Sequence, residues 1–118
     1  LDFITANGLP NFTSHSAGAT IIDADEGASV SVTIVASESD GGTVTYSLNS
    51  GSLPTGVTLN TSTGVISGTL PTVSADTNFN FTIRATDNEN QTSDRSFTIT
   101  VRDVYTMSGS AEFVVILG

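Results

Sequence analysis

Apolar and polar residues alternate one by one in several segments of the chain. The longest alternating segments are residues 30–37, 44–48, 79–86 and 97–102. Because successive side chains of a β-strand point to opposite faces of a sheet, each segment is predicted to be a strand with one buried and one exposed face. Shorter strands are predicted at residues 20–22, 57–59 and 65–66. No segment repeats its apolar residues at helical spacing, so the pattern predicts an all-β domain of about seven strands.

Residues that favour turns separate these strands. Residues 40–42 (Asp-Gly-Gly) predict a tight hairpin turn, because glycine adopts positive φ angles without steric cost. Residues 53–56 predict a turn led by proline, and residues 87–90 join the last two strands. About seven short strands separated in this way are typical of an Ig-like antiparallel β-sandwich. The predicted core consists of the inward-facing residues Val32, Ile34, Tyr46, Leu48, Leu59, Ile66, Phe79, Phe81, Ile83, Phe97, Ile99 and Val101.

Residues 46–69 carry the most specific motif of the chain. A tyrosine-containing strand leads into a Leu-Pro-x-Gly turn at residues 53–56, followed by a Thr-Gly-x-Ile-x-Gly-Thr stretch at residues 63–69. With Ala-Thr-Asp at 85–87 and Phe-Thr-Ile-Thr-Val at 97–101, the chain resembles the bacterial putative-Ig family, which is close to the dystroglycan-type cadherin-like domains. The resemblance implies an Ig-like or cadherin-like sandwich that serves as a spacer or interaction module of a larger protein.

The two ends of the chain differ from its middle. We predict a sandwich over residues 16–103, an N-terminal extension or linker over 1–15, and a C-terminal segment over 104–118. This C-terminal segment ends in five consecutive apolar residues with high β propensity: Phe113, Val114, Val115, Ile116 and Leu117. They form either the first strand of a following domain or an assembly strand that pairs with a neighbouring copy of the chain.

Charge and composition exclude several kinds of function. The chain has 3 Lys+Arg against 12 Asp+Glu, a net charge of −9, and it contains neither lysine nor cysteine. A nucleic-acid partner would need a basic surface, and an anionic membrane would repel this chain. The ligands of a zinc site and the cysteine or lysine nucleophiles of many enzymes are missing. No apolar run approaches the roughly 20 residues of a membrane-spanning helix, so no membrane insertion is expected.

No group of residues indicates catalysis. The one histidine, His15, lies in the irregular N-terminal segment, where it is expected to be exposed and away from any fixed serine. Asp23, Asp25 and Glu26 form an acidic cluster, which is better explained by a turn before Gly27 than by a catalytic pair of carboxyl groups. We therefore expect the chain not to be an enzyme.

Calcium is the one cofactor that the composition allows. Four acids fall where cadherin-like domains place calcium ligands: Glu26, Asp40, Asp87 and Asp103. The loops at one end of a sandwich can bring such carboxylates together around a hard cation. However, residues 70–72 (Leu-Pro-Thr) replace the cadherin Asp-Arg-Glu motif, and residues 103–105 lack the Asp-x-Asn-Asp-Asn linker. The four acids therefore either bind calcium or only keep their loops soluble.

These observations predict a non-enzymatic structural or adhesive module of a larger bacterial surface, secreted or phage virion protein. Its expected partners are other protein chains or neighbouring domains, further copies in a homo-oligomer, filament or particle, and a host-surface glycan or protein. The alternative is a calcium- or glycan-binding accessory module of a secreted hydrolase. Both predictions place the module outside the cell, on its surface or in a virion.

Overall fold

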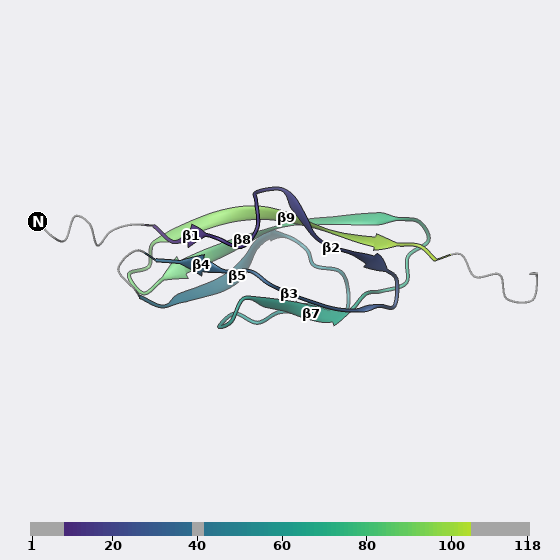
Figure 1. The fold of residues 1–118 in the computed structure, drawn as a ribbon, viewed down its shortest axis with the longest axis horizontal. Helices are drawn as coiled ribbons and strands as arrows, with labels where there is room; N and C mark the ends of the chain where they lie inside the picture. Colours follow the sequence, from purple (N-terminus) through teal and green to yellow (C-terminus); the bar gives the residue numbers. More distant parts are fainter. Residues whose placement is uncertain (1–8, 39–41, 105–118) are drawn as a thin grey trace, which may run out of the picture.

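Nine β-strands and no helix make up the regular structure of residues 9–38 and 42–104, the residues that this computed structural model describes. In chain order the strands are β1 (Asn11–Phe12), β2 (Ala19–Asp25), β3 (Ser29–Thr33), β4 (Ala36–Ser37), β5 (Val44–Gly51), β6 (Val57–Leu59), β7 (Val65–Thr69), β8 (Thr77–Asp87) and β9 (Thr92–Arg102). One sheet has the order β2-β9-β8-β5, a second has the order β3-β7-β6, and β1 pairs with β4. The two larger sheets pack as two layers over one apolar core (Figure 1). The predicted all-β sandwich is therefore confirmed.

The antiparallel hairpin of β8 and β9 forms the middle of the larger sheet. Its ladder runs from Thr77 opposite Val101 to Thr86 opposite Thr92. Along residues 79–86 and 97–102 the side chains alternate between the apolar core and the polar outer face, as the sequence pattern predicts. The most deeply buried of the inward side chains, each 2 % exposed or less, are Phe81, Ile83, Ala85, Phe97, Ile99 and Val101.

Strand β2 departs from the expected antiparallel arrangement. It pairs with β9 in parallel, from Ala19 opposite Phe97 to Asp25 opposite Arg102. The rest of the sandwich connects these two strands, so no tight turn forces them to run in opposite directions. As a result, β2 and β9 end at the same end of the sandwich (Figure 1), where the amide of Glu26 donates a hydrogen bond to the carbonyl oxygen of Arg102 at 2.9 Å.

The prediction of one strand over residues 30–37 is wrong, because this segment forms two short strands in different sheets. Strand β3 pairs with β7, whereas β4 pairs with β1. Between them, the amide of Val35 donates to Ser14 Oγ at 2.9 Å, and its carbonyl oxygen accepts from the amide of Thr13 at 2.8 Å. The chain therefore leaves the sheet of β7 where the N-terminal segment supplies new hydrogen-bond partners.

Residues 11–15, which the sequence assigned to an N-terminal extension, pack against the sandwich. Phe12 is 6 % exposed and belongs to the core, and the Arg95 guanidinium lies 5.4 Å from the centre of its ring. Contrary to expectation, His15 is partly buried, with its ring edge-on to Phe97 at 6.1 Å between centroids. Arg95 Nη1 also donates to the carbonyl oxygen of His15 at 2.6 Å. The packed part of the chain thus begins before residue 16.

Leu48 was predicted to lie in the core, but it is 41 % exposed. It lies on β5, an edge strand whose register with β8 shifts between Leu48 and Ser50. Such a shift adds twist and changes the direction of the side chains, which simple alternation does not reveal. Val32, Leu59 and Phe79 pack partly buried against the core, and the other predicted core residues are buried.

Three sequence predictions concern residues outside the described part of the chain. They are the hairpin turn at 40–42, of which residues 40 and 41 are not described, Asp40 as a calcium ligand, and the assembly strand Phe113–Leu117. Within residues 9–38 and 42–104, no helix is long and apolar enough to cross a membrane.

The hydroxyl group of Tyr46 connects β5 to β4. It is buried and accepts a hydrogen bond from the amide of Ala36 at 2.9 Å. The substitution Tyr46→Phe leaves that amide without this acceptor, so we expect the free energy of unfolding in urea to fall by about 1–3 kcal/mol. Ser47 is exposed on the same strand, so Ser47→Ala is the control and should alter the free energy of unfolding by less than about 0.5 kcal/mol. Equal stability of the Tyr46→Phe variant and the parent would contradict this role.

Candidate functional site

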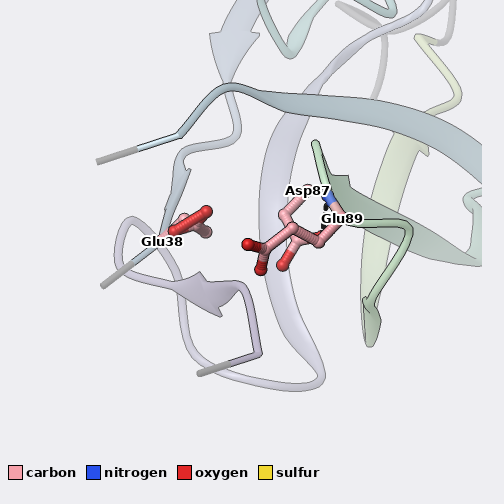
Figure 2. Close-up of side chains that lie close together, drawn as sticks. All are labelled: Glu38, Asp87 and Glu89. Carbon is pink, nitrogen blue, oxygen red and sulfur yellow. Dashed lines mark hydrogen bonds between the residues drawn. The ribbon is translucent and has the colours of Figure 1, made fainter. Parts of the chain in front are cut away.

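Three acidic side chains meet at one end of the sandwich. Glu38 directly follows β4, Asp87 is the last residue of β8, and Glu89 lies in the turn between β8 and β9. One carboxylate oxygen from each residue lies within 4.8 Å of the other two. Figure 2 shows the Asp87 and Glu89 side chains reaching from the β8–β9 turn toward Glu38. We call these three residues the acidic end.

Asp87 is held in place by the turn that follows it. Its Oδ1 accepts hydrogen bonds from the amides of Glu89 at 2.9 Å and Gln91 at 2.8 Å, and the residue is only 4 % exposed. Its second oxygen, Oδ2, is buried and has no hydrogen-bond partner among the described residues. A buried carboxylate oxygen without a partner costs free energy unless a positive charge compensates it.

Glu38 is also deeply buried, at 7 % exposed. It continues the inward-facing positions of Ile34 and Ala36, so the backbone directs its side chain toward the interior. The backbone of Gly42 packs against it, because a Cβ atom at Gly42 would collide with Glu38 Oε2 and with Asn88 Oδ1. The acidic end therefore has the amide oxygen of Asn88 close to its carboxylates.

The three arginines of the chain make their contacts away from the acidic end. Arg84 Nε lies 2.8 Å from Asp94 Oδ1, and Arg102 Nε lies 2.6 Å from Asp23 Oδ1. Both ion pairs are on the outer face of the larger sheet. The hydrogen bonds from these guanidinium groups lower the pKa values of Asp94 and Asp23. Arg95 binds the N-terminal segment, as described above.

Carboxylates this close together repel one another. Two unit charges 4.8 Å apart repel by roughly 1 kcal/mol in water, and by more where protein excludes water. A cation taken from solution would compensate this repulsion and the buried Asp87 Oδ2. Carboxylate and amide oxygens are the ligands that hard divalent cations prefer, and calcium tolerates irregular arrangements of them.

Of the four acids that the sequence proposed as calcium ligands, the structure describes three and does not bring these three together. Asp87 belongs to the acidic end, whereas Glu26 and Asp103 lie at the opposite end, where β2 and β9 finish. The eleven residues of β8, at about 3.3 Å each, separate the two ends by roughly 35 Å. Asp40 lies outside the described residues.

At that opposite end, acidic side chains hold loops through their main-chain amides. Glu26 Oε1 accepts a hydrogen bond from the amide of Val73 at 2.9 Å. Asp76 Oδ1 accepts one from the amide of Asp103 at 2.8 Å. These contacts connect the loop before β8 to the ends of β2 and β9, so they have a structural role of their own.

Sequence reasoning missed Glu38 and Glu89. A signal for Glu38 was present, because it follows Ile34 and Ala36 in the same alternation that marks buried positions. An acid that continues an inward-facing series is a stronger candidate than one in a loop. Glu89 carries no comparable signal, because acids are common in turns.

The Putative Ig domain family matches residues 10–102 of the chain. The chain belongs to this family. A search of the curated proteins found no relative.

Solved structures share the fold of this Ig-like domain at low sequence identity. The extracellular cadherin domains 1–4 of protocadherin gamma B7 give a TM-score of 0.66 at 19% identity, over 84% of this chain and 25% of that one. The human desmocollin-1 ectodomain gives 0.61 at 20% identity, over 82% of this chain and 20% of that one. A nucleoside hydrolase-related hypothetical protein from Saccharophagus degradans, associated with carbohydrate metabolism, gives a TM-score of 0.61 at 20% identity, over 81% of this chain and 26% of that one. The chain thus spans about a quarter or less of each of these chains.

Asp87 should hold the β8–β9 turn even without a metal ion. In EDTA, we expect Asp87→Ala to lower the free energy of unfolding by about 1–3 kcal/mol, because the amides of Glu89 and Gln91 lose their acceptor. Asp87→Asn keeps an oxygen that accepts from these amides and removes one of three neighbouring charges. Its free energy of unfolding should therefore fall clearly less than that of Asp87→Ala. Urea unfolding measures both, and an equal loss in the two variants would contradict this role of Oδ1.

Proposed function

We propose that the chain is a non-enzymatic structural or adhesive module of a larger extracellular, cell-surface or virion protein, and that its acidic end binds a calcium ion. The observation that supports the calcium proposal most strongly is the burial of the Asp87 carboxylate. Its Oδ2 is buried and has no hydrogen-bond partner in the described part of the chain, in a cluster that contains two further carboxylates. A side chain in this position is stabilised by a cation and destabilised without one.

Calcium fits this cluster better than smaller divalent ions do. It accepts six to eight oxygen ligands at about 2.3–2.6 Å with little demand on geometry, whereas magnesium requires a nearly regular octahedron. Glu38, Asp87 and Glu89 would supply the charged ligands, and the amide oxygen of Asn88 lies beside Glu38. Water and main-chain carbonyl oxygens can complete the coordination.

An ion at the acidic end would connect three separate segments of the chain. Glu38 follows β4, Asp87 closes β8, and Glu89 belongs to the turn before β9. The ion would fix this end relative to the sandwich, so that the module could transmit force or hold a neighbouring domain in one orientation. Stiffening is a useful contribution of a spacer or adhesive module, and it needs no catalytic group.

The context of the module is supported by its family and by the proteins that share its fold. Among them, one protocadherin gamma B7 structure contains extracellular cadherin domains 1–4, and another is a cis-dimer of the same protein. We therefore expect protein partners or neighbouring domains outside the cell. The alternative, an accessory module of a secreted hydrolase, changes only what the module is joined to and would use the same calcium site.

Calcium should raise the melting temperature of the chain. If the dissociation constant lies near that of extracellular calcium modules, about 0.1–1 mM, then 10 mM CaCl2 adds roughly 1.4–2.7 kcal/mol to the stability. For a domain of this size, we expect an increase of at least roughly 5 °C over EDTA. Magnesium at the same concentration should give a smaller increase.

The variants Asp87→Asn and Glu38→Gln should remove most of this increase, because each removes one charged ligand. Asp103→Asn is the matched control, since it makes the same change of charge at the opposite end and should keep the full increase. An increase that survives Asp87→Asn, or that disappears in Asp103→Asn, would contradict binding at the acidic end. No increase in the parent chain would contradict calcium binding altogether.

A further inference from the structure

Among residues 9–38 and 42–104, one long side of the sandwich has two strand edges that pair with no other strand. Strand β2 is the outer strand of its sheet, and β3 is the outer strand of the other sheet. Five apolar residues on and beside these two strands are only partly buried: Ile21, Ala24, Ala28, Val30 and Val32. We call this side of the molecule the β2–β3 seam. It combines free main-chain hydrogen-bonding groups with incompletely covered apolar side chains.

The register of β3 shows which of its main-chain groups are free. The amide of Ile34 donates to Gly64, and the carbonyl oxygen of Ala28 accepts from Leu70. Hydrogen-bonded positions alternate along an antiparallel ladder, so the even-numbered residues of β3 face β7. The amide and carbonyl groups of Ser29, Ser31 and Thr33 therefore point to the open edge.

This edge lacks the features that normally prevent strand addition. Residues 29–33 (Ser-Val-Ser-Val-Thr) contain no charged residue and no proline, and their ladder with β7 has no register shift. The other edges are less open. Asp23 and Asp25 are exposed on β2, β5 has a shifted register and donates from Tyr46 to Thr61, and β6 has only three residues.

We propose that the free edge of β3 accepts residues 113–117 (Phe-Val-Val-Ile-Leu) of a second copy of this chain as an additional antiparallel strand. The donor segment and the acceptor strand each have five residues, and both are uncharged. An added strand would satisfy the groups of Ser29, Ser31 and Thr33 and place alternate apolar side chains over the β2–β3 seam.

A second copy is the better donor because of the direction of the strands. In one chain, β9 ends beside the start of β3, so residues 113–117 that follow this edge directly would run parallel to it. An antiparallel arrangement within one chain would require residues 105–112 to extend past the five residues of β3 and then reverse direction. Parallel pairs are slightly less stable for each residue than antiparallel pairs. A neighbouring copy can approach in the opposite direction, and residues 105–112 span up to roughly 30 Å when extended.

Each copy would then have one donor and one acceptor, which produces head-to-tail association. We expect the weight-average mass of the 118-residue chain, measured by light scattering, to rise above 12.1 kDa with concentration. Ser31→Pro should be monomeric, because it removes an edge donor but no hydrogen bond to β7. Ser31→Thr keeps the donor and should associate like the parent.

Deletion of residues 111–118 should also give a monomer, because it removes the donor segment. The decisive experiment mixes this truncated chain with the Ser31→Pro chain. The former retains the acceptor edge and the latter retains the donor strand, so together they should form a one-to-one complex that neither forms alone. EDTA should not change this association, which makes its outcome independent of the calcium proposal.

A monomeric parent chain at all accessible concentrations would overturn the proposal, as would a mixture that stays monomeric. Association of folded Ser31→Pro at the parent level would overturn it too. If Ser31→Pro melts below the parent, Ser31→Lys replaces it, because a charge at the edge opposes pairing with an apolar strand while all main-chain donors remain. In that case, association of Ser31→Lys at the parent level would overturn the proposal.

Discussion

The long ladder between β8 and β9 orders the other elements of the sandwich. Its ten residue pairs hold two alternating strands in register, so that their apolar side chains form a continuous inner surface. Strand β2 adds to this hairpin on one side and β5 adds on the other. Phe97 lies at its centre, 1 % exposed, with its ring near those of Phe12 and Phe81. The hairpin also separates the two ends of the module, since its turn forms one end and the last residues of β9 approach the other.

The sequence was sufficient for the elements in which local pattern and tertiary packing agree. Residues 79–86 of β8 and 97–102 of β9 alternate between apolar and polar side chains because one face of each strand meets the core and the other meets solvent. The pattern failed where the environment changes along a strand. Residues 30–37 alternate except at Val35, and the hydrogen bonds of Val35 with Ser14 and Thr13 divide the segment between two sheets. The prediction that Leu48 lies in the core fails for a related reason, because a register shift on an edge strand changes which side chains reach the core.

The candidate site shows the same limit. A resemblance to cadherin-like domains indicated which kinds of loop carry acids, but it could not show that Glu26 and Asp103 are a strand length away from Asp87. Only the tertiary structure reveals that distance. The burial of Glu38, by contrast, could have been read from Ile34 and Ala36, because an acid in an inward-facing series is rarely accidental. The place of Glu89 in the acidic end could be recognised only from the conformation of the turn between β8 and β9.

Calcium binding at the acidic end can be tested by a crystal structure of the parent chain grown with calcium chloride, with the ion identified by its anomalous scattering. We expect one ion coordinated by Glu38, Asp87 and Glu89, with oxygens at about 2.3–2.6 Å and Asp87 Oδ2 among them. An acidic end without an ion at saturating calcium would rule out this site. So would an ion bound only by Glu26 and Asp103 at the opposite end of the sandwich.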